Sequence, residues 1–327
     1  MEIIPIVHCF DNNYVLPAGV AFYSLLEKSN PNYYYKIYVL HNDITKENQE
    51  KLKESITVFK NGEIIFKNME NRFQEEWKEL KFKGYYSKEM FYKLFIPSIF
   101  NEYDKVIVSD VDVIYLDDIS FEYNKFDVND DYYIAGINII NTQETKKYYE
   151  EAYRKFSKEE KKKLVCAAGY FIMNAKKCRE EKIEEKFVRC FIENKGRLKQ
   201  AEQDILNLCC YPKIKELPIR NLVCTYMYNK GAYDYIKDET ILIEIEKAKK
   251  FPVQLHYATP IKPWKNLGIP KADEWVKVLA KTIFLNEYLK QIQEKISIID
   301  NKRKILKINI PYKKNKRISV ELNKEKI

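Results

Sequence analysis

The sequence predicts an α/β fold built around a mainly parallel sheet. Short apolar, β-branched segments alternate with helix-length segments through the first third of the chain, and this alternation is typical of parallel strands connected by helices. Of the 327 residues, 46% are hydrophobic, so the chain can bury a large core. This hydrophobic fraction excludes the class of highly charged, disordered chains.

Four strands are expected in the first 110 residues, each marked by an apolar or β-branched run: Ile3–Cys9, Lys36–Leu40, Glu63–Lys67 and Lys105–Val108. Helices are expected between them, over about residues 17–28, 45–55 and 87–97. Residues 30–32, Asn-Pro-Asn, end the first helix. Thr45 and Ser87 are expected to cap the other two, and Pro97 lies near the end of the third. The less regular second half predicts two strands and a helix: Gly169–Asn174, Val253–His256 and Glu202–Leu208.

Two acidic residues follow the fourth strand, in the segment Ser-Asp110-Val-Asp112. Ligands of such sheets bind at the carboxyl ends of strands, so this segment and the one after Val7 are expected to form two walls of one site. Residues i and i+2 of an extended chain point to the same side. Asp110 and Asp112 therefore offer two oxygen ligands to a hard divalent cation, although aspartate pairs also end strands without any function.

His256 ends an apolar strand and is followed by Lys262 and Trp264. Taken alone, it is explained most simply as a core histidine. Together with the two aspartates it would complete a set of two oxygens and one nitrogen suited to Mn²⁺.

Three further segments have ordinary structural explanations beside functional ones. Asp11 and Asn13 fit turn and capping chemistry, and they also fit hydrogen bonds to a nucleotide base or ribose. The small residues 167–169 fit either close approach of a ligand or tight packing. Residues 202–204, Glu-Gln-Asp, begin a helix, where acidic side chains are favoured by the helix dipole.

These segments, in this order, resemble glycosyltransferase family 8, the retaining, metal-dependent sugar transferases of the bacterial lipopolysaccharide galactosyltransferase and glycogenin type. The resemblance extends from about Ile3 to Trp264 and rests on six motifs: Asp11-Asn-Asn-Tyr14, Phe91-Tyr-Lys93-Leu94, Ser109-Asp-Val-Asp112, Ala167-Ala-Gly169 with Met173-Asn174, Glu202-Gln-Asp-Ile-Leu-Asn207 and His256-Tyr-x-x-Pro-x-Lys262-Pro-Trp264. It implies the GT-A fold, a Rossmann-like mixed sheet flanked by helices. The nucleotide-sugar-binding catalytic domain is expected over residues 1–265, followed by a helical and basic extension over 266–327.

The resemblance also implies roles for individual residues. Metal ligands would be Asp110, Asp112 and His256, with Mn²⁺ as the expected metal and Mg²⁺ as a second option. The residues expected to bind the nucleotide-sugar are Cys9, Phe10, Asp11, Asn13, Lys93, Asp110, Val111, Asp112, Ala168, Gly169, Gln203 and Lys262. Gln203 and Asp204 are expected to be catalytic and to orient the donor sugar. Because an amide is a poor nucleophile, front-face attack is favoured over a covalent intermediate.

The implied activity is transfer of a hexose, galactose or glucose, from a UDP-sugar to a saccharide or glycoconjugate acceptor. Ala167 replaces an Asn found in many relatives, Glu202 replaces a frequent Asp, and Thr259 replaces a frequent Gly, so the identity of the donor sugar stays open. A phosphatase of the haloacid-dehalogenase type, using Mg²⁺ and a phosphorylated Asp110 beside Asp112, is the alternative. That motif normally lies on the first strand, and the alternative gives His256 no role.

Three features of the sequence predict the cellular compartment of the protein. No apolar run approaches the roughly 18 residues of a membrane span, and the N-terminus lacks the features of a signal peptide. The cysteines number seven, without a CxxC pair, so neither a disulfide framework nor a zinc site is indicated. A cytoplasmic protein is expected.

Most of the net charge of +9 lies at the C-terminal end. From Ser297 to Ile327 there are ten Lys or Arg against three Asp or Glu, which gives +7. Apolar residues lie among these cations, so reversible attachment to the anionic inner face of the cell membrane is favoured over a solvated tail. Since no nucleic-acid-binding module is visible, a nucleic-acid partner is not expected.

Overall fold

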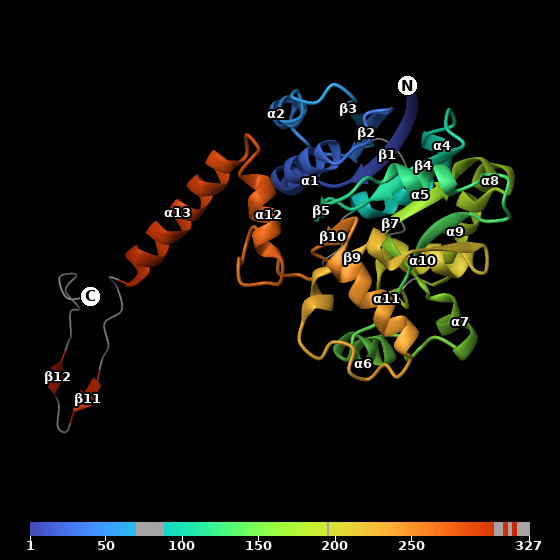
Figure 1. Ribbon diagram of the computed structural model, residues 1–327. Coiled ribbons are helices and arrows are strands. Elements are labelled where there is room, and N and C mark those ends of the chain that lie inside the picture. Colours follow the sequence, from blue (N-terminus) through green and yellow to red (C-terminus); the bar gives the residue numbers. More distant parts are fainter. Residues whose placement is uncertain (70–87, 195, 304–309, 313–315, 319–327) are drawn as a thin grey trace. The chain divides into compact units, whose positions relative to one another are not determined.

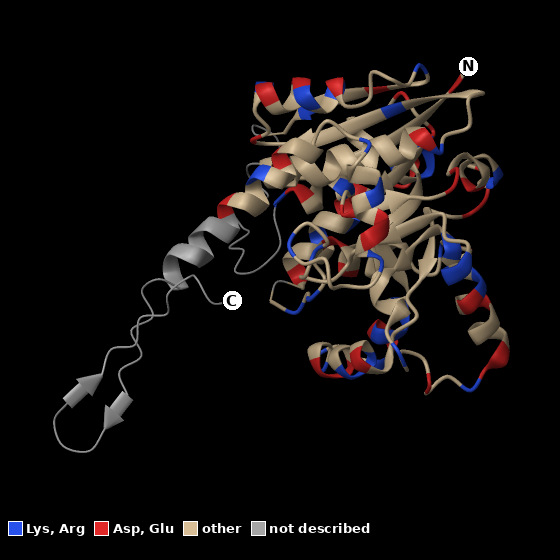
Figure 2. Ribbon diagram, turned by 60° about the vertical axis from the view of Figure 1, so that its left-hand side comes forward, with Lys and Arg blue, Asp and Glu red and all other residues tan. Residues whose placement is uncertain are grey.

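The computed structural model of the protein describes residues 1–69, 88–194, 196–303, 310–312 and 316–318, with side chains described through residue 294 (Figure 1). The chain divides into two compact units, Met1–Thr282 and Ile283–Ile327. In the first unit a mixed sheet is flanked by helices, so the predicted α/β class is confirmed. Lys, Arg, Asp and Glu are interspersed along its helices and loops (Figure 2), as expected for the nearly neutral part of the chain.

The main sheet has seven strands in the order β3-β2-β1-β4-β7-β6-β8. Their bounds are β1 Glu2–Cys9, β2 Tyr33–His41, β3 Gly62–Asn68, β4 Lys105–Ser109, β6 Ile134–Asn138, β7 Cys166–Asn174 and β8 Ile214–Leu217. β1 pairs in parallel with β2 and β4, β2 with β3, and β6 with β8. β7 runs antiparallel to both of its neighbours, β4 and β6. The sheet is therefore mainly parallel, as predicted, with one reversed strand.

Helices cover both sides of this sheet, which explains why its central strands β1, β4 and β7 are nearly continuous apolar runs. The α-helices of the first unit are α1 Val15–Glu27, α2 Lys46–Glu54, α4 Ile96–Ile99, α5 Ser120–Lys125, α6 Gln143–Ala152, α7 Lys158–Lys163, α8 Ala175–Glu180, α9 Ile183–Glu193, α10 Ala201–Cys210, α11 Glu239–Lys250 and α12 Ala272–Leu279. In Figure 1, α1 and α12 lie to the left of the sheet, and α8 and α9 lie to its right. One core cluster joins β1, β4 and β7 to the 3₁₀ helix η2 (Lys88–Phe95) and to α4, α8, α9 and α10.

Two predicted helix boundaries are tested by the structure. Thr45 caps α2 as expected, because its hydroxyl accepts a hydrogen bond from the N–H of Asn48 (3.2 Å). The third predicted helix instead consists of a 3₁₀ helix, η2 (Lys88–Phe95), followed by α4. Pro97 lies two residues after the end of η2, in the first turn of the four-residue α4, where the N–H that a proline lacks has no helical partner. Ser87, the predicted cap, lies outside the described residues.

A second, three-stranded sheet has the order β5-β10-β9. Its strands are β5 Val113–Tyr115, β9 Val223–Cys224 and β10 Gln254–His256. β10 runs antiparallel to β5 and places His256 opposite Val113. His256 is thereby brought beside the segment that follows β4, although the two are more than 100 residues apart along the chain.

The first unit continues past residue 265, the boundary predicted from the sequence, through Thr282. Trp275 of α12 is fully buried, and its ring lies 5.7 Å from that of Trp264. The second unit contains α13 (Leu285–Arg303) and an antiparallel pair of short strands, β11 (Ile310–Tyr312) and β12 (Lys316–Ile318). Within the described residues, every helix is too short or too polar to span a membrane.

Candidate active site

Asp110 and Asp112 lie in the turn that connects β4 to β5. The N–H of Asp110 donates to the carbonyl of Gly169 (3.0 Å), and the N–H of Tyr257 donates to the carbonyl of Asp112 (2.9 Å). The intervening Val111 is buried. Backbone hydrogen bonds thus hold both aspartates, one to β7 and the other to the end of β10.

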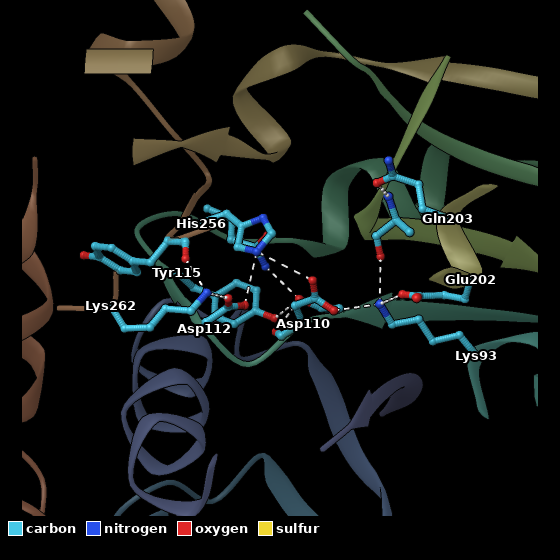
Figure 3. Close-up of polar contacts among 12 residues, drawn as sticks. Lys93, Asp110, Asp112, Tyr115, Glu202, Gln203, His256 and Lys262 are labelled. Carbon is cyan, nitrogen blue, oxygen red and sulfur yellow. Dashed lines mark hydrogen bonds and ion pairs between the residues drawn. The ribbon is translucent and has the colours of Figure 1, made fainter. Parts of the chain in front are cut away.

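The two aspartates and His256 form a metal-type cluster (Figure 3). Nε2 of His256 lies 3.1 Å from Oδ1 of Asp112 and 3.6 Å from Oδ2 of Asp110. One ligand atom from each residue lies within 4.8 Å of the others, and no other such group of His, Cys, Asp or Glu occurs in the part of the chain that the structure describes. Two carboxylates and an imidazole are a suitable donor set for Mn²⁺, so the residues fit the predicted metal.

Charges within and beside the cluster shift the pKa values of two of its members. Burial lowers the pKa of His256, but the Asp112 carboxylate outweighs this effect and the pKa rises to about 10. Burial favours protonation of Asp112, yet His256 and Lys262 hold its pKa well below the usual range. Because a metal ion binds a neutral imidazole, cation binding here would release a proton from His256.

Lys262 adds a buried positive charge on the other side of Asp112. Its Nζ lies 2.5 Å from Oδ2 of Asp112 and donates to the carbonyl of Tyr257 (2.7 Å). One oxygen of the Asp112 carboxylate thus faces His256, and the other faces Lys262. The structure brings this lysine to the metal-type cluster, where the resemblance predicts contact with a diphosphate.

Lys93 is buried beside Asp110 and has an exposed fraction of 1%. Its Nζ donates to Oδ1 of Asp110 (2.7 Å), Oε1 of Glu202 (2.8 Å) and the carbonyl of Ala168 (3.1 Å). An ammonium group has three donors, and all three are used here. Burial opposes the charge of Lys93, but the two carboxylates raise its pKa above the usual value. In this arrangement Lys93 holds Asp110, and its contact with a donor sugar stays a prediction.

Glu202 lies in one of the six family motifs, yet the sequence predicts no role for its side chain at the site. Its position in the first turn of α10 had a sufficient explanation in the helix dipole. The side chain is instead 2% exposed, and burial raises its pKa despite the ion pair with Lys93. The signal for this partner in the sequence is Lys93, which lies among apolar residues. Burial of such a lysine requires a carboxylate partner elsewhere in the chain.

Gly169 has a packing role. A Cβ atom at this position would lie 2.7 Å from Cε1 of His256 and 3.4 Å from Oδ2 of Asp110. The absence of a side chain therefore leaves room for the imidazole. Of the two explanations offered for residues 167–169, tight packing is the one seen, and contact with a donor stays a prediction.

Gln203 and Asp204, the predicted catalytic residues, have different surroundings. Oε1 of Gln203 accepts from the N–H of Ala168 (3.0 Å), and the side chain is half-buried. The carboxylate of Asp204 is buried and accepts from the Tyr153 hydroxyl (2.6 Å). It also accepts from the N–H groups of residues 199 and 200. Asp204 therefore anchors the start of α10, and Gln203 is the more accessible of the two.

The predicted nucleotide-binding segment follows β1. Oδ1 of Asp11 accepts from the N–H of Asn13 (2.9 Å) and caps a 3₁₀ turn, η1 (Asn12–Tyr14). The turn chemistry offered as the simpler explanation is thus present. Phe10 is buried and packs near Phe22, whereas Cys9 is half-buried and Asn13 is exposed. Nucleotide contacts from these residues stay a prediction.

Comparison with known proteins identifies the family. The model of the family described as Glycosyl transferase family 8 matches residues 5–268. The chain belongs to glycosyltransferase family 8. It is 26% identical to General stress protein A of Bacillus subtilis strain 168, over 86% of this chain and 94% of that protein. It is 23% identical to Glycosyltransferase GlyE of Streptococcus pneumoniae serotype 4, over 86% of this chain and 63% of that protein.

Solved structures of family 8 enzymes share the fold. The bifunctional glycosyltransferase WbbM superposes with a TM-score of 0.70 at 23% identity, over 88% of this chain and 51% of that chain. This chain thus spans about half of that structure. The galactosyltransferase LgtC, solved with donor and acceptor sugar analogues, superposes with a TM-score of 0.66 at 19% identity, over 86% of this chain and 96% of that chain. The family 8 protein is a glycosyltransferase with the GT-A fold, as the sequence predicted, and the phosphatase alternative loses its support.

Proposed function

We propose that this family 8 protein transfers a hexose, galactose or glucose, from a UDP-sugar to a saccharide or glycoconjugate acceptor, with retention and with Mn²⁺ as cofactor. The observation that carries the proposal is the Asp110–Asp112–His256 cluster, which lies at the carboxyl end of β4 in a chain of this family. Ligands of open α/β sheets bind at that edge.

Mn²⁺ held by these three residues would supply the Lewis acidity that stabilises a departing diphosphate. The chain's own residues add to this. Lys262 is held 2.5 Å from Asp112, so its positive charge would stabilise negative charge on a diphosphate bound at the cluster. Lys93 fixes the first aspartate from the opposite side.

Retention is proposed to occur by front-face attack. The family resemblance assigns Gln203 to the position of a candidate nucleophile, and an amide is poorly suited to that role. Its Oε1 accepts from the N–H of Ala168, and this bond fixes the orientation of the amide that we propose to contact the donor sugar. Asp204, bound to Tyr153 and to the start of α10, keeps Gln203 in place.

Nucleotide binding is assigned to the segment after β1, with Cys9, Phe10, Asp11 and Asn13 near the uridine and ribose. The support is its place at the carboxyl end of the strand next to β4 in the sheet. Residues 167–169 and Gln203 are assigned to the wall around the donor sugar.

Attachment to the cytoplasmic face of the membrane is proposed for the C-terminal extension. The support is the net charge of +7 from Ser297 to Ile327, since each basic residue near an anionic surface contributes about 1 kcal/mol. A membrane-linked acceptor would then be within reach of the catalytic unit.

A donor screen tests the proposed activity. The protein is incubated with Mn²⁺ and a panel of UDP-, GDP- and CMP-sugars, and release of the nucleotide is recorded. Hydrolysis or transfer restricted to a UDP-hexose, with an α-configured product seen by NMR, is the expected result. Preference for a GDP- or CMP-sugar, or an inverted product, would contradict the proposal.

A further inference from the structure

A fully buried hydroxyl lies next to the first aspartate. Ser109 is the last residue of β4. Its Oγ accepts hydrogen bonds from the Tyr115 hydroxyl (2.9 Å) and from Nε2 of Gln254 (2.9 Å), and it donates to the carbonyl of Asp110 (3.1 Å). A serine hydroxyl has one donor and two acceptor positions. All of its hydrogen-bonding capacity is therefore used inside the protein.

The two donors come from the two other segments that carry metal-type ligands. Tyr115 lies on β5, three residues after the second aspartate, and is labelled in Figure 3. Gln254 lies on β10, two residues before His256. One oxygen atom thus connects the three segments that deliver the candidate ligands.

This oxygen also connects the two sheets. β4 belongs to the seven-stranded sheet, whereas β5 and β10 belong to the three-stranded sheet. The metal-type cluster combines a residue from the end of the first sheet, Asp110, with His256 from the second. The separation of these two side chains therefore depends on how the sheets are held together at Ser109.

The three side chains that meet at the Ser109 hydroxyl are buried. Ser109 and Gln254 have exposed fractions of 0%, and that of Tyr115 is 1%. Bulk water cannot replace a lost partner at this depth, and an unpaired buried polar group carries a desolvation penalty. Loss of one bond is then relieved by movement of the strands that carry it.

We infer that the Ser109 hydroxyl, with Tyr115 and Gln254, is a positioning group for the metal site, because it sets the distance between Asp110 and the ligands on the second sheet. The inference rests on the proposed function, since it assumes that the cluster holds a divalent cation. Removal of groups that orient metal ligands typically weakens metal binding by about 10–100-fold.

Tyr170 supplies a matched control. It lies on β7, opposite Ser109 in the strand register, and is fully buried. Its hydroxyl has no hydrogen-bond partner among the described residues. Tyr115→Phe and Tyr170→Phe therefore remove the same atom from two buried rings, and only Tyr115→Phe removes a bond to Ser109.

The test measures Mn²⁺ binding to the full-length protein directly, from the electron paramagnetic resonance signal of the free ion, with and without UDP. Ser109→Ala and Tyr115→Phe are each expected to weaken Mn²⁺ binding by about tenfold. The loss in the double variant should be smaller than the product of the two single losses, because both act through one contact. Tyr170→Phe should bind Mn²⁺ like the wild type, and UDP affinity without metal should be the same for Tyr115→Phe and the wild type.

Tyr115→Phe decides the question if Ser109→Ala protein does not fold. Wild-type Mn²⁺ affinity in Tyr115→Phe, or equal losses in Tyr115→Phe and Tyr170→Phe, would overturn the inference and leave the proposed function standing. A wild-type protein that binds no Mn²⁺ would overturn the metal site itself, and the inference with it.

Discussion

The imidazole of His256 packs against Gly169 so closely that a Cβ atom at position 169 would stand 2.7 Å from Cε1. The carbonyl of the same glycine accepts the hydrogen bond from the N–H of Asp110. Gly169 therefore fixes one candidate metal ligand and leaves space for another. Through Gly169, β7 therefore contacts two of the three candidate metal ligands.

Gly169→Ala is expected to displace the imidazole and weaken Mn²⁺ binding by about tenfold or more. The ring is flanked by the two aspartates, so it must move away from its position beside them. Calorimetry of Mn²⁺ binding checks this result. Gly268→Ala is the control, because Gly268 is exposed and its added methyl would meet only the side-chain oxygen of Asn266. Equal affinities in all three proteins would show that the contact has no bearing on the metal.

Asp110→Asn and Asp112→Asn are each expected to lower donor turnover by at least about 100-fold, because each removes a charged oxygen ligand from the cation. Lys93 and Lys262 keep other hydrogen-bond acceptors, Glu202 and the carbonyl of Tyr257. Circular dichroism should therefore show a folded protein. Turnover is measured as UDP release, and wild-type rates in either variant would remove that residue from the metal site.

His256→Ala should weaken UDP binding only when Mn²⁺ is present. The expected reason is loss of the one nitrogen ligand, with no direct contact between the histidine and the nucleotide. Calorimetric titration of UDP with and without Mn²⁺ separates the two conditions. An equal loss in both would assign His256 a structural role, as the simplest explanation of its sequence context proposed.

Lys93→Met is expected to destabilise the fold by about 3–5 kcal/mol, because it leaves the buried carboxylate of Glu202 without its cation. Lys93→Met combined with Glu202→Gln should recover part of this loss, since the uncompensated charge is removed. Urea denaturation measures the free energy of unfolding. Lys281→Met is the control: its ion pair with Glu27 is exposed, so about 0–1 kcal/mol is expected. A similar small loss for Lys93→Met would contradict the role given to the buried ion pair.

Deletion of the residues after about Asp300 should release the protein from anionic vesicles and leave donor hydrolysis unchanged. Seven of the nine net positive charges lie between Ser297 and Ile327. Sedimentation with phosphatidylglycerol vesicles at low salt checks the attachment, and zwitterionic vesicles are the control. Full-length protein that stays in the supernatant would leave the extension as a solvated end or a contact to another protein.

Much of the fold could be predicted because its signals are local. The strand Ile3–Cys9 is a single apolar run, and Thr45 is a capping residue directly before a helical segment, so both were placed correctly. The segment before Pro97 is helical as predicted, but it is a 3₁₀ helix, and Pro97 lies in the first turn of a second, short helix, because proline is favoured in a first helical turn as well as beyond a helix end. Sequence alone did not distinguish the two positions.

The metal-type cluster could be predicted because two of its members are two residues apart and the third follows in a family motif. The residues that support the cluster could not be predicted in the same way. Glu202 contacts Lys93, which is 109 residues away along the chain, and Gln254 contacts Ser109, which is 145 residues away. Glu202 lies in a family motif and Gln254 in an apolar strand, but neither position predicts which side chain the residue contacts, because an acidic helix start and a glutamine in a strand are both common.

The central claim is a Mn²⁺-dependent UDP-sugar site at the Asp110–Asp112–His256 cluster, and metal removal and return tests it most directly. UDP release from UDP-galactose and UDP-glucose is measured in protein treated with a chelator, and again after addition of Mn²⁺ or Mg²⁺. The account predicts no turnover in the chelated protein, full recovery with Mn²⁺ and weaker recovery with Mg²⁺. Full activity in the chelated protein, or no release of UDP from either sugar with Mn²⁺ present, would contradict it.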